Sequence, residues 1–370
     1  MKDMGTGQLY QIAAAPFEAA RILTDLPLYH PARRLHGHSF LARAACVGGD
    51  EPSVLASLLA SCAARLDYSL LNDTLDLPTD QNLAHWLRQC LGLSNTVVGI
   101  RSQQDQGAAL AQDERTHFWY RFRFEAAHWL PQVAPQHPCG RMHGHGFEVV
   151  LQVVESLNDA LASPMPSSTD PMTALVAVAR SLHEVLDGSC LNDLPGLQNP
   201  TSEILAEWIW QRTKPLLPSL AYVTIHETAT SSCLYDGKSY HIWKAMYFES
   251  ALSGATVTKA HASRLLGHSY LLRLYLSAPL DEVMGWTVDY GDVKNLFLPI
   301  YAELDHHLLN DLPGLTATDL SNVVCWIRDR ATPLLPLLSR IDLFETPLRG
   351  ISWLAPASDP ALVLSPWPTR

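Results

Sequence analysis

Three histidines carry the clearest chemical signal in the sequence. His143 and His145 lie two residues apart where a strand is expected to start, so their side chains share one face. His128 follows the preceding expected strand, 117–127, and antiparallel pairing would bring its imidazole to the same point. Three imidazoles with an open fourth position are typical of a catalytic zinc site. We therefore predict that these histidines hold Zn²⁺, the alternative being a turn with surface histidines.

Cys139 lies four residues before His143. It could be a fourth metal ligand, a buried structural thiol or a catalytic thiolate. A thiolate beside Zn²⁺ and imidazoles has a lowered pKa and can act as a base or a nucleophile. The residues alone leave the three roles open.

The surroundings of these residues occur three times along the chain. Phe124–His128 and His137–His145 have counterparts in Phe17–Arg21 and His30–His38, and a weaker third copy begins at Phe248. A second signature, Leu-Asp followed by Asn-Asp, comes later in each copy. It stands at Leu66–Asp73, Leu186–Asp193 and Leu304–Asp311. The repeats predict three domains, 1–112, 113–236 and 237–370.

Each copy is expected to run strand, strand, helix, helix, strand, strand. In the second copy, residues 117–127 alternate with aromatic side chains on one face, as a strand does. Pro200, Thr201 and Glu203 are typical of a helix start. The other expected strands are 146–154, 220–226, 231–235, 268–277 and a weakly marked 107–111; the expected helices are 173–186 and 202–214, and 156–172 is expected to be a Ser/Pro-rich loop.

Composition excludes several classes of protein. Among 370 residues, 47% are hydrophobic and 17% charged, which favours globular domains over disorder. The net charge of −11 argues against a nucleic-acid partner. Seven scattered cysteines without a CxxC pair favour a reducing compartment over a disulfide framework. With no expected signal peptide or membrane-spanning run, we predict a cytoplasmic protein that does not contact the membrane.

The arrangement resembles the 6-pyruvoyl-tetrahydropterin synthase and 6-carboxytetrahydropterin synthase family, which has the tunnelling fold. The family pattern is F-x-A-A-H, a cysteine before H-G-H, D-F-x-x-L-K, L-D-H-x-x-L-N, P-T-x-E and a late E-T. The second copy supplies FEAAH, Cys139, HGH, PTSE and Glu227-Thr228. The third supplies DYGDVK from Asp289 onward, Asp305-His306 and Glu345-Thr346. The short spacing from Cys139 to the HGH resembles the bacterial carboxytetrahydropterin branch.

The resemblance implies an α+β fold. Three tandem ββααββ units would form a pseudo-trimeric β-barrel with the helices outside, and two chains could stack as a homodimer of pseudo-trimers. It also implies a zinc ion that polarises the side chain of a pterin triphosphate, with sites between subunits. The implied roles are metal ligands for His128, His143 and His145, proton transfer for Cys139 assisted by Asp305 and His306, and substrate binding for Thr201 and for Glu227 or Glu345.

The three copies differ at the site positions. Arg21 stands where the first copy would have its first histidine, and the third copy has Leu252 and Leu266 at ligand positions. The Asp-His pair stands only in the third copy, at Asp305-His306. We therefore expect one composite site, within one chain or across a dimer, that joins the second copy's metal set to this pair. The alternative for the pair is a polar helix end.

The sequence thus predicts a zinc-dependent pterin synthase that resembles 6-carboxy-5,6,7,8-tetrahydropterin synthase. Such a lyase acts on 7,8-dihydroneopterin triphosphate in the 7-deazapurine (queuosine) pathway. Two alternatives remain open. One is a 6-pyruvoyl-type synthase or an aldolase acting on another pterin, and the other is a non-catalytic scaffold that binds a pterin.

Overall fold

The computed structural model describes residues 7–48, 52–93, 95–155, 170–253, 265–280, 290–356 and 358–366. Within them, one order of elements occurs three times. The first run is β1 (Gln8–Arg21), β2 (His36–Val47), α1 (Pro52–Ala64), α2 (Asp80–Leu91), β4 (Thr96–Arg101) and β5 (Gln106–Leu110). The second is β6 (Thr116–His128), β7 (His143–Glu155), α4 (Pro171–Leu186), α5 (Ser202–Thr213), β8 (Leu220–Thr228) and β9 (Ser231–Tyr235). The third is β10 (Tyr240–Ser253), β11 (Leu265–Ala278), α6 (Tyr290–Leu304), α7 (Leu320–Ala331), β13 (Leu338–Thr346) and β14 (Arg349–Leu354).

Short elements complete these runs. The two-residue strands β3 (Ser69–Leu70) and β12 (His307–Leu308) pair in parallel with β1 and β10. The 3₁₀ helices are η1 (Pro31–Arg33), η2 (Leu71–Asp73), η3 (Pro138–Gly140), η4 (Leu191–Asp193), η5 (Leu309–Asp311) and η6 (Pro360–Leu364).

The predicted elements agree with the structure apart from their ends. The weakly marked strand at 107–111 is β5, and β7 begins at His143, earlier than the expected 146. The predicted loop 156–172 is wrong at its end, because Asp170 caps α4 and the helix starts at Pro171. The rest of that loop, residues 156–169, lies outside the described residues. Asp289 of the DYGDVK motif also lies outside them. The domain boundaries stay a prediction.

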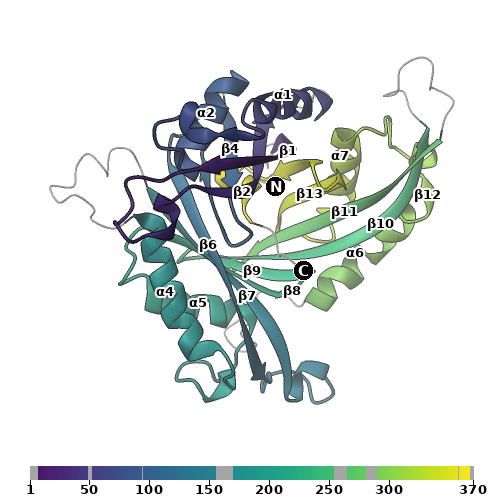
Figure 1. The fold of residues 1–370 in the computed structure, drawn as a ribbon. Coiled ribbons are helices and arrows are strands. Elements are labelled where there is room, and N and C mark those ends of the chain that lie inside the picture. Colours follow the sequence, from purple (N-terminus) through teal and green to yellow (C-terminus); the bar gives the residue numbers. More distant parts are fainter. Residues whose placement is uncertain are drawn as a thin grey trace.

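The long strands close into an antiparallel barrel. Neighbours in the sheet run β11-β13-β14-β1-β2-β4-β5-β6-β7-β8-β9-β10, and β10 pairs again with β11. The helices lie outside the curved sheet in three pairs (Figure 1). This confirms the predicted α+β barrel with external helices. None of the described helices combines the length and apolar character needed to span a membrane.

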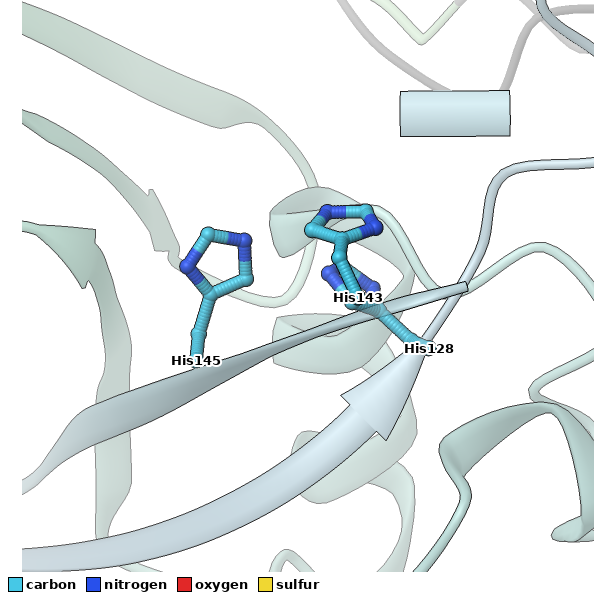
Figure 2. A group of neighbouring side chains, drawn as sticks. All are labelled: His128, His143 and His145. Atoms are coloured by element: carbon cyan, nitrogen blue, oxygen red, sulfur yellow. The ribbon is translucent and has the colours of Figure 1, made fainter. Parts of the chain in front are cut away.

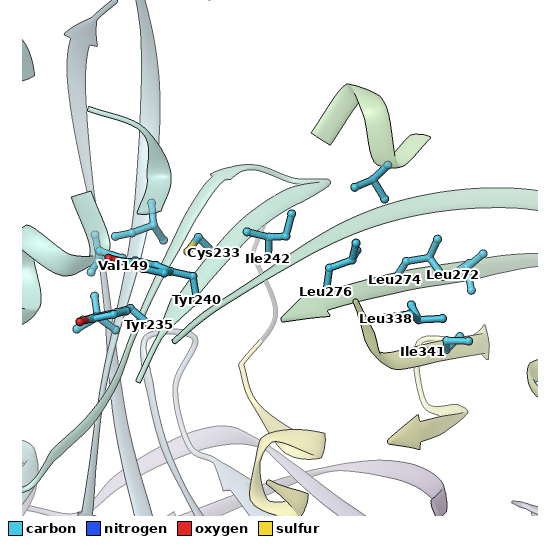
Figure 3. Close-up of a cluster of buried hydrophobic side chains, with 14 of the residues drawn as sticks. Val149, Cys233, Tyr235, Tyr240, Ile242, Leu272, Leu274, Leu276, Leu338 and Ile341 are labelled. Carbon is cyan, nitrogen blue, oxygen red and sulfur yellow. The ribbon is translucent and has the colours of Figure 1, made fainter. Parts of the chain in front are cut away.

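The hydrophobic core lies between the barrel wall and these helices. Because side chains alternate along a strand, every second residue faces outward and packs against a helix. Figure 3 shows part of this layer, in which Cys233, Ile242 and Leu274 are buried along neighbouring strands. An aromatic pair recurs in each run near the ends of its first two strands. The stacked pairs are Phe17–Phe40, Phe124–Phe147 and Phe248–Tyr270, with ring centroids 4.9, 5.1 and 5.0 Å apart.

The repeated Asn of the Leu-Asn-Asp signature fastens the end of the first strand in each run. In the second run, the Asn192 side chain accepts from the backbone N of Trp129 at 3.0 Å and donates to its O at 2.8 Å. Asn72 makes the same pair of bonds with Ile22, and Asn310 with Ser253. In each run the signature therefore forms a polar turn whose Asn side chain holds the neighbouring strand end.

Candidate metal centre

The three predicted histidines lie together at the ends of β6 and β7. The strands pair in a register that sets His128 opposite His143 and Ala126 opposite His145. One ring nitrogen from each histidine lies within 4.8 Å of the others. Figure 2 shows the three imidazoles side by side above the two strands. Among the described residues, this is the one cluster of side chains that could hold a metal ion.

Backbone carbonyls orient two of the rings. His128 Nδ1 lies 3.1 Å from the oxygen of Pro200, and His143 Nδ1 lies 2.7 Å from the oxygen of Arg141. If these nitrogens carry the protons, both Nε2 atoms keep a lone pair, as metal-bound histidines do. His128 Nε2 is buried and accepts no hydrogen bond in the described structure.

The electrostatics also suit a metal ligand. Burial, together with the neighbouring His143, lowers the pKa of His128 to about 4. The imidazole is therefore neutral near pH 7, the form that binds a metal. A buried nitrogen without a partner among neutral imidazoles fits Zn²⁺, which prefers such ligands.

Cys139 is not a member of the histidine cluster. It stands in η3, half-buried, where its backbone N donates to His137 Nδ1 at 3.2 Å and its O accepts from Leu130 N at 2.8 Å. The fourth-ligand role is therefore not supported by the structure. The structural and the catalytic roles stay as predictions.

Of the two predicted glutamates, only Glu227 lies at the histidine cluster. Its Oε1 is 3.5 Å from His145 Nε2, and its side chain is 19% exposed. Burial and the neighbouring carboxylate of Glu203 raise the pKa of Glu227 to about 7, with Lys244 opposing them. Glu345 instead forms an ion pair with Arg349 across the turn between β13 and β14.

The start of α5 lies next to these residues. Thr201 caps the helix, since its Oγ1 accepts from Ile204 N at 3.2 Å. Ser202 Oγ lies 3.1 Å from the hydroxyl of Tyr290, which begins α6 in the third run. Glu203 is 1% exposed. The second and third runs therefore meet at this site.

Three of these neighbours were not among the predicted site residues. Glu203 belongs to the PTSE motif, and Tyr290 stands at the Phe position of D-F-x-x-L-K, so both had a signal. Lys244 had none. It comes from β10, where its Nζ donates to Ser231 Oγ at 2.8 Å.

Asp305 and His306 lie together but not at the cluster. His306 Nδ1 is 2.9 Å from Asp305 Oδ2, and Asp305 Oδ1 accepts from Glu249 N at 2.9 Å. His306 has a φ of 59° and a side chain that is 76% exposed. Every partner that the described structure gives the pair belongs to the third run, so this chain by itself does not join the pair to the histidines.

The first run lacks the third imidazole. Arg21 there forms an ion pair with Asp80 at 2.7 Å and donates to the oxygen of Pro78 at 3.1 Å. His36 and His38 remain beside it, their ring centroids 4.9 Å apart.

Comparisons with known proteins agree with this picture. The sequence model of the 6-pyruvoyl tetrahydropterin synthase family matches residues 117–238 and 241–354. A 6-carboxy-5,6,7,8-tetrahydropterin synthase of Synechocystis sp. (strain ATCC 27184 / PCC 6803 / Kazusa) is 34% identical over 115 residues, which are 31% of this chain and 88% of that protein.

Two solved structures show weaker likeness. The 6-pyruvoyl tetrahydropterin synthase of Caenorhabditis elegans aligns with 31% of this chain and 95% of its own, at 18% identity and a TM-score of 0.29. A urate oxidase of Bacillus sp. TB-90 aligns with 61% of this chain and 87% of its own, at 8% identity and a TM-score of 0.34. The two matches of the family's sequence model together cover more than half of the chain, which therefore belongs to the 6-pyruvoyl tetrahydropterin synthase family.

Proposed function

We propose that this protein is a zinc-dependent pterin synthase of the 6-carboxytetrahydropterin type, with 7,8-dihydroneopterin triphosphate as its substrate. The observation that carries the proposal is the convergence of His128, His143 and His145 within 4.8 Å, with the Glu227 carboxylate 3.5 Å from one of them. The Synechocystis relative, a 6-carboxy-5,6,7,8-tetrahydropterin synthase, supports the choice of branch. The queuosine pathway is the setting that this activity implies.

The three histidines would hold Zn²⁺, which supplies a Lewis acid for the oxygens of the substrate's side chain. Glu227 would bind the pterin ring. The amino-pyrimidine edge of a pterin presents two N–H donors, and an ionised carboxylate accepts both in charge-assisted hydrogen bonds. A pKa raised to about 7 means that such donors would favour the ionised form of Glu227 on binding. Thr201 would line the same pocket from the start of α5.

Proton transfer would fall to Cys139, His306 and Asp305. Because His306 is 76% exposed and has no contact with the cluster in its own chain, we propose that it serves the metal centre of a second chain. This requires a homodimer in which two barrels stack. Asp305 would then hold the His306 imidazole in place, as it does here at 2.9 Å.

The barrel explains why runs without a metal site would be kept. We propose that the three runs are tunnelling-fold units, so that one chain takes the place of a trimer. β5 pairs with β6, β9 with β10, and β14 with β1, so each run covers the sheet edges of its neighbours. Loss of one run would expose two edges that favour aggregation.

The test is the metal content of the purified chain, followed by incubation with 7,8-dihydroneopterin triphosphate. We expect about one zinc per chain and formation of 6-carboxytetrahydropterin. A 6-pyruvoyl product would move the protein to the other branch of the family. A zinc-free chain without turnover would favour the pterin-binding scaffold.

A further inference from the structure

Five arginines line the interior of the barrel. On each of their strands the adjacent residues, such as Ala42 and Ala44 or Leu272 and Leu274, pack outward against the helices. The alternation of a strand therefore turns the arginines inward. These lumen arginines are Arg43 on β2, Arg101 on β4, Arg121 on β6, Arg273 on β11 and Arg340 on β13.

Two buried carboxylates offset only part of this charge. Glu148 pairs with Arg121 at 3.1 Å, and Asp342 pairs with Arg340 at 2.6 Å. The carboxylate of Asp105 also lies near Arg121, so five guanidinium groups face three carboxylates and an excess of positive charge remains inside the wall. This positive charge disfavours the charged form of Arg43, because burial and the neighbouring Arg273 and Arg340 lower its pKa to about 9.

Three of the lumen arginines open onto one cavity. It has a volume of about 300 Å³ and is lined by Arg43, Arg101 and Arg121 together with Gln104. Among the residues that the structure describes, no Asp or Glu lines this cavity. Across the part of the chain that the structure describes, the side chain of Arg101 has neither a hydrogen bond nor an ion pair. Burial lowers its pKa, so its charge is partly desolvated without compensation.

The C-terminal segment around η6 enters the lumen and forms one wall of this cavity. Its residues contact β2, β4 and β5, and Leu364 and Pro366 line the cavity. The carbonyl oxygen of Leu364 accepts from Arg43 at 3.0 Å, and that of Val363 accepts from Arg340 at 3.2 Å. These neutral carbonyls satisfy hydrogen bonds but leave the charge excess in place.

We propose that this cavity is a binding site for a small phosphate-class anion, held by Arg43, Arg101 and Arg121. The planar guanidinium fork matches the oxygens of a phosphoryl group, and three such forks around one space favour a multivalent anion. A volume of about 300 Å³ lies at the small end of ligand pockets, which suits inorganic phosphate or a short polyphosphate. The same chemistry would accept the phosphoryl group of a nucleotide. The site is separate from the metal centre and does not depend on the proposed function.

The test is binding and thermal stability with inorganic phosphate, inorganic triphosphate and AMP, each against sodium chloride of equal ionic strength. Arg101→Gln removes one guanidinium, and Arg180→Gln is the matched control on the outer surface of α4, where Arg180 is exposed. We expect phosphate or triphosphate to raise the Tm beyond chloride. Arg101→Gln should weaken binding roughly tenfold or more, as loss of hydrogen bonds between charged groups does, and Arg180→Gln should bind as the wild type does. Tighter binding of AMP than of the inorganic anions would assign the site to a nucleotide.

Two results would overturn the proposal: no anion effect beyond chloride, or equal binding by Arg101→Gln and wild type. If Arg101→Gln does not fold, Arg101→Lys is the second variant; it keeps the charge but loses the fork, so binding should weaken several-fold, and unchanged binding would count against the site. All measurements are repeated in His128→Gln. Binding that persists there lies outside the metal centre, whereas binding lost there would place the anion at the metal centre and contradict the lumen site.

Discussion

The guanidinium of Arg21 and the carboxylate of Asp80 form a buried ion pair, 2.7 Å apart, at the position that corresponds to the histidine cluster of the second run. The registers correspond, since Arg21 pairs with His36 as His128 pairs with His143. Arg21 donates to the oxygen of Pro78, and His128 Nδ1 contacts that of Pro200. A side-chain cation thus occupies the place where we propose a metal ion in the second run.

Arg21→His should therefore create a second metal site. The variant would place a third imidazole beside His36 and His38, with the carbonyl of Pro78 available to orient it. We expect the zinc content to rise from about one to about two per chain, measured by elemental analysis. Arg21→Leu is the control: it should unfold more easily, because Asp80 stays buried without its partner, and should gain no zinc. A zinc content unchanged in Arg21→His would contradict the equivalence of the two sites.

His128→Gln and His306→Ala should separate metal binding from proton transfer. His128 is a buried member of the cluster, so its replacement should remove zinc and turnover together. His306 lies outside the cluster, so His306→Ala should keep its zinc and lower kcat by a factor of about 10²–10⁴. Metal content and steady-state kinetics measure both. Zinc loss in His306→Ala, or full occupancy in His128→Gln, would show that the roles are misassigned.

The histidine cluster could be predicted from sequence because its geometry is local to one hairpin. Residues two apart on a strand share a face, which places His143 and His145 together. Antiparallel pairing of the neighbouring strand then places His128 beside them. The order of helices and strands could also be predicted, because the sequence repeats indicate the same order in each run. The sequence also predicted that Arg21 takes the place of the first histidine in the first run. The structure agrees, since Arg21 pairs with His36 as His128 pairs with His143.

The rest depended on contacts between distant segments. Lys244 reaches the neighbourhood of Glu227 only because β9 pairs with β10, and Tyr290 meets Ser202 only because the second and third runs pack side by side. The choice between Glu227 and Glu345 was equally non-local, since both stand in the same E-T motif. The lumen arginines gave no sequence signal either, because a charged residue at alternate strand positions is the usual pattern of a solvent-facing edge.

Glu227→Gln and Glu345→Gln should behave differently. Glu227 lies 3.5 Å from His145 and is nearly enclosed, whereas Glu345 pairs with Arg349. An amide at 227 can accept only one of the two pterin N–H groups, so we expect kcat/KM to fall by a factor of about 10² or more, as loss of charged hydrogen bonds implies. Glu345→Gln should stay within about threefold of the wild type, since Glu345 is paired with Arg349 and makes no contact with the histidine cluster. The reverse order would assign the anchor to Glu345.

Acid should destabilise the first run through His38. Burial and the nearby charges of Arg21 and His36 lower the folded-state pKa of His38 from 6.5 to about 4. The unfolded chain then binds a proton at a higher pH than the folded one, so this stabilisation is complete above pH 6.5 and is lost as the pH falls toward 4. His38→Gln should lose less Tm than the wild type between pH 7 and pH 5. The variant His306→Gln, which changes an exposed histidine, should lose as much Tm between pH 7 and pH 5 as the wild type does. An equal loss of Tm in the wild type and both variants would refute the role of His38.

Asn192 should matter for stability and for the metal together. Its side chain holds both backbone groups of Trp129, the residue that follows His128. Asn192→Ala leaves those groups without their partner, which should cost about 1–3 kcal/mol in urea unfolding. Asn192→Asp can still accept from Trp129 N but cannot donate to its oxygen, so its loss should be smaller. Because the bonds fix the end of β6 next to His128, zinc should also dissociate faster from Asn192→Ala. An unchanged urea midpoint in Asn192→Ala would mean that the strand end is held by pairing with β7 alone.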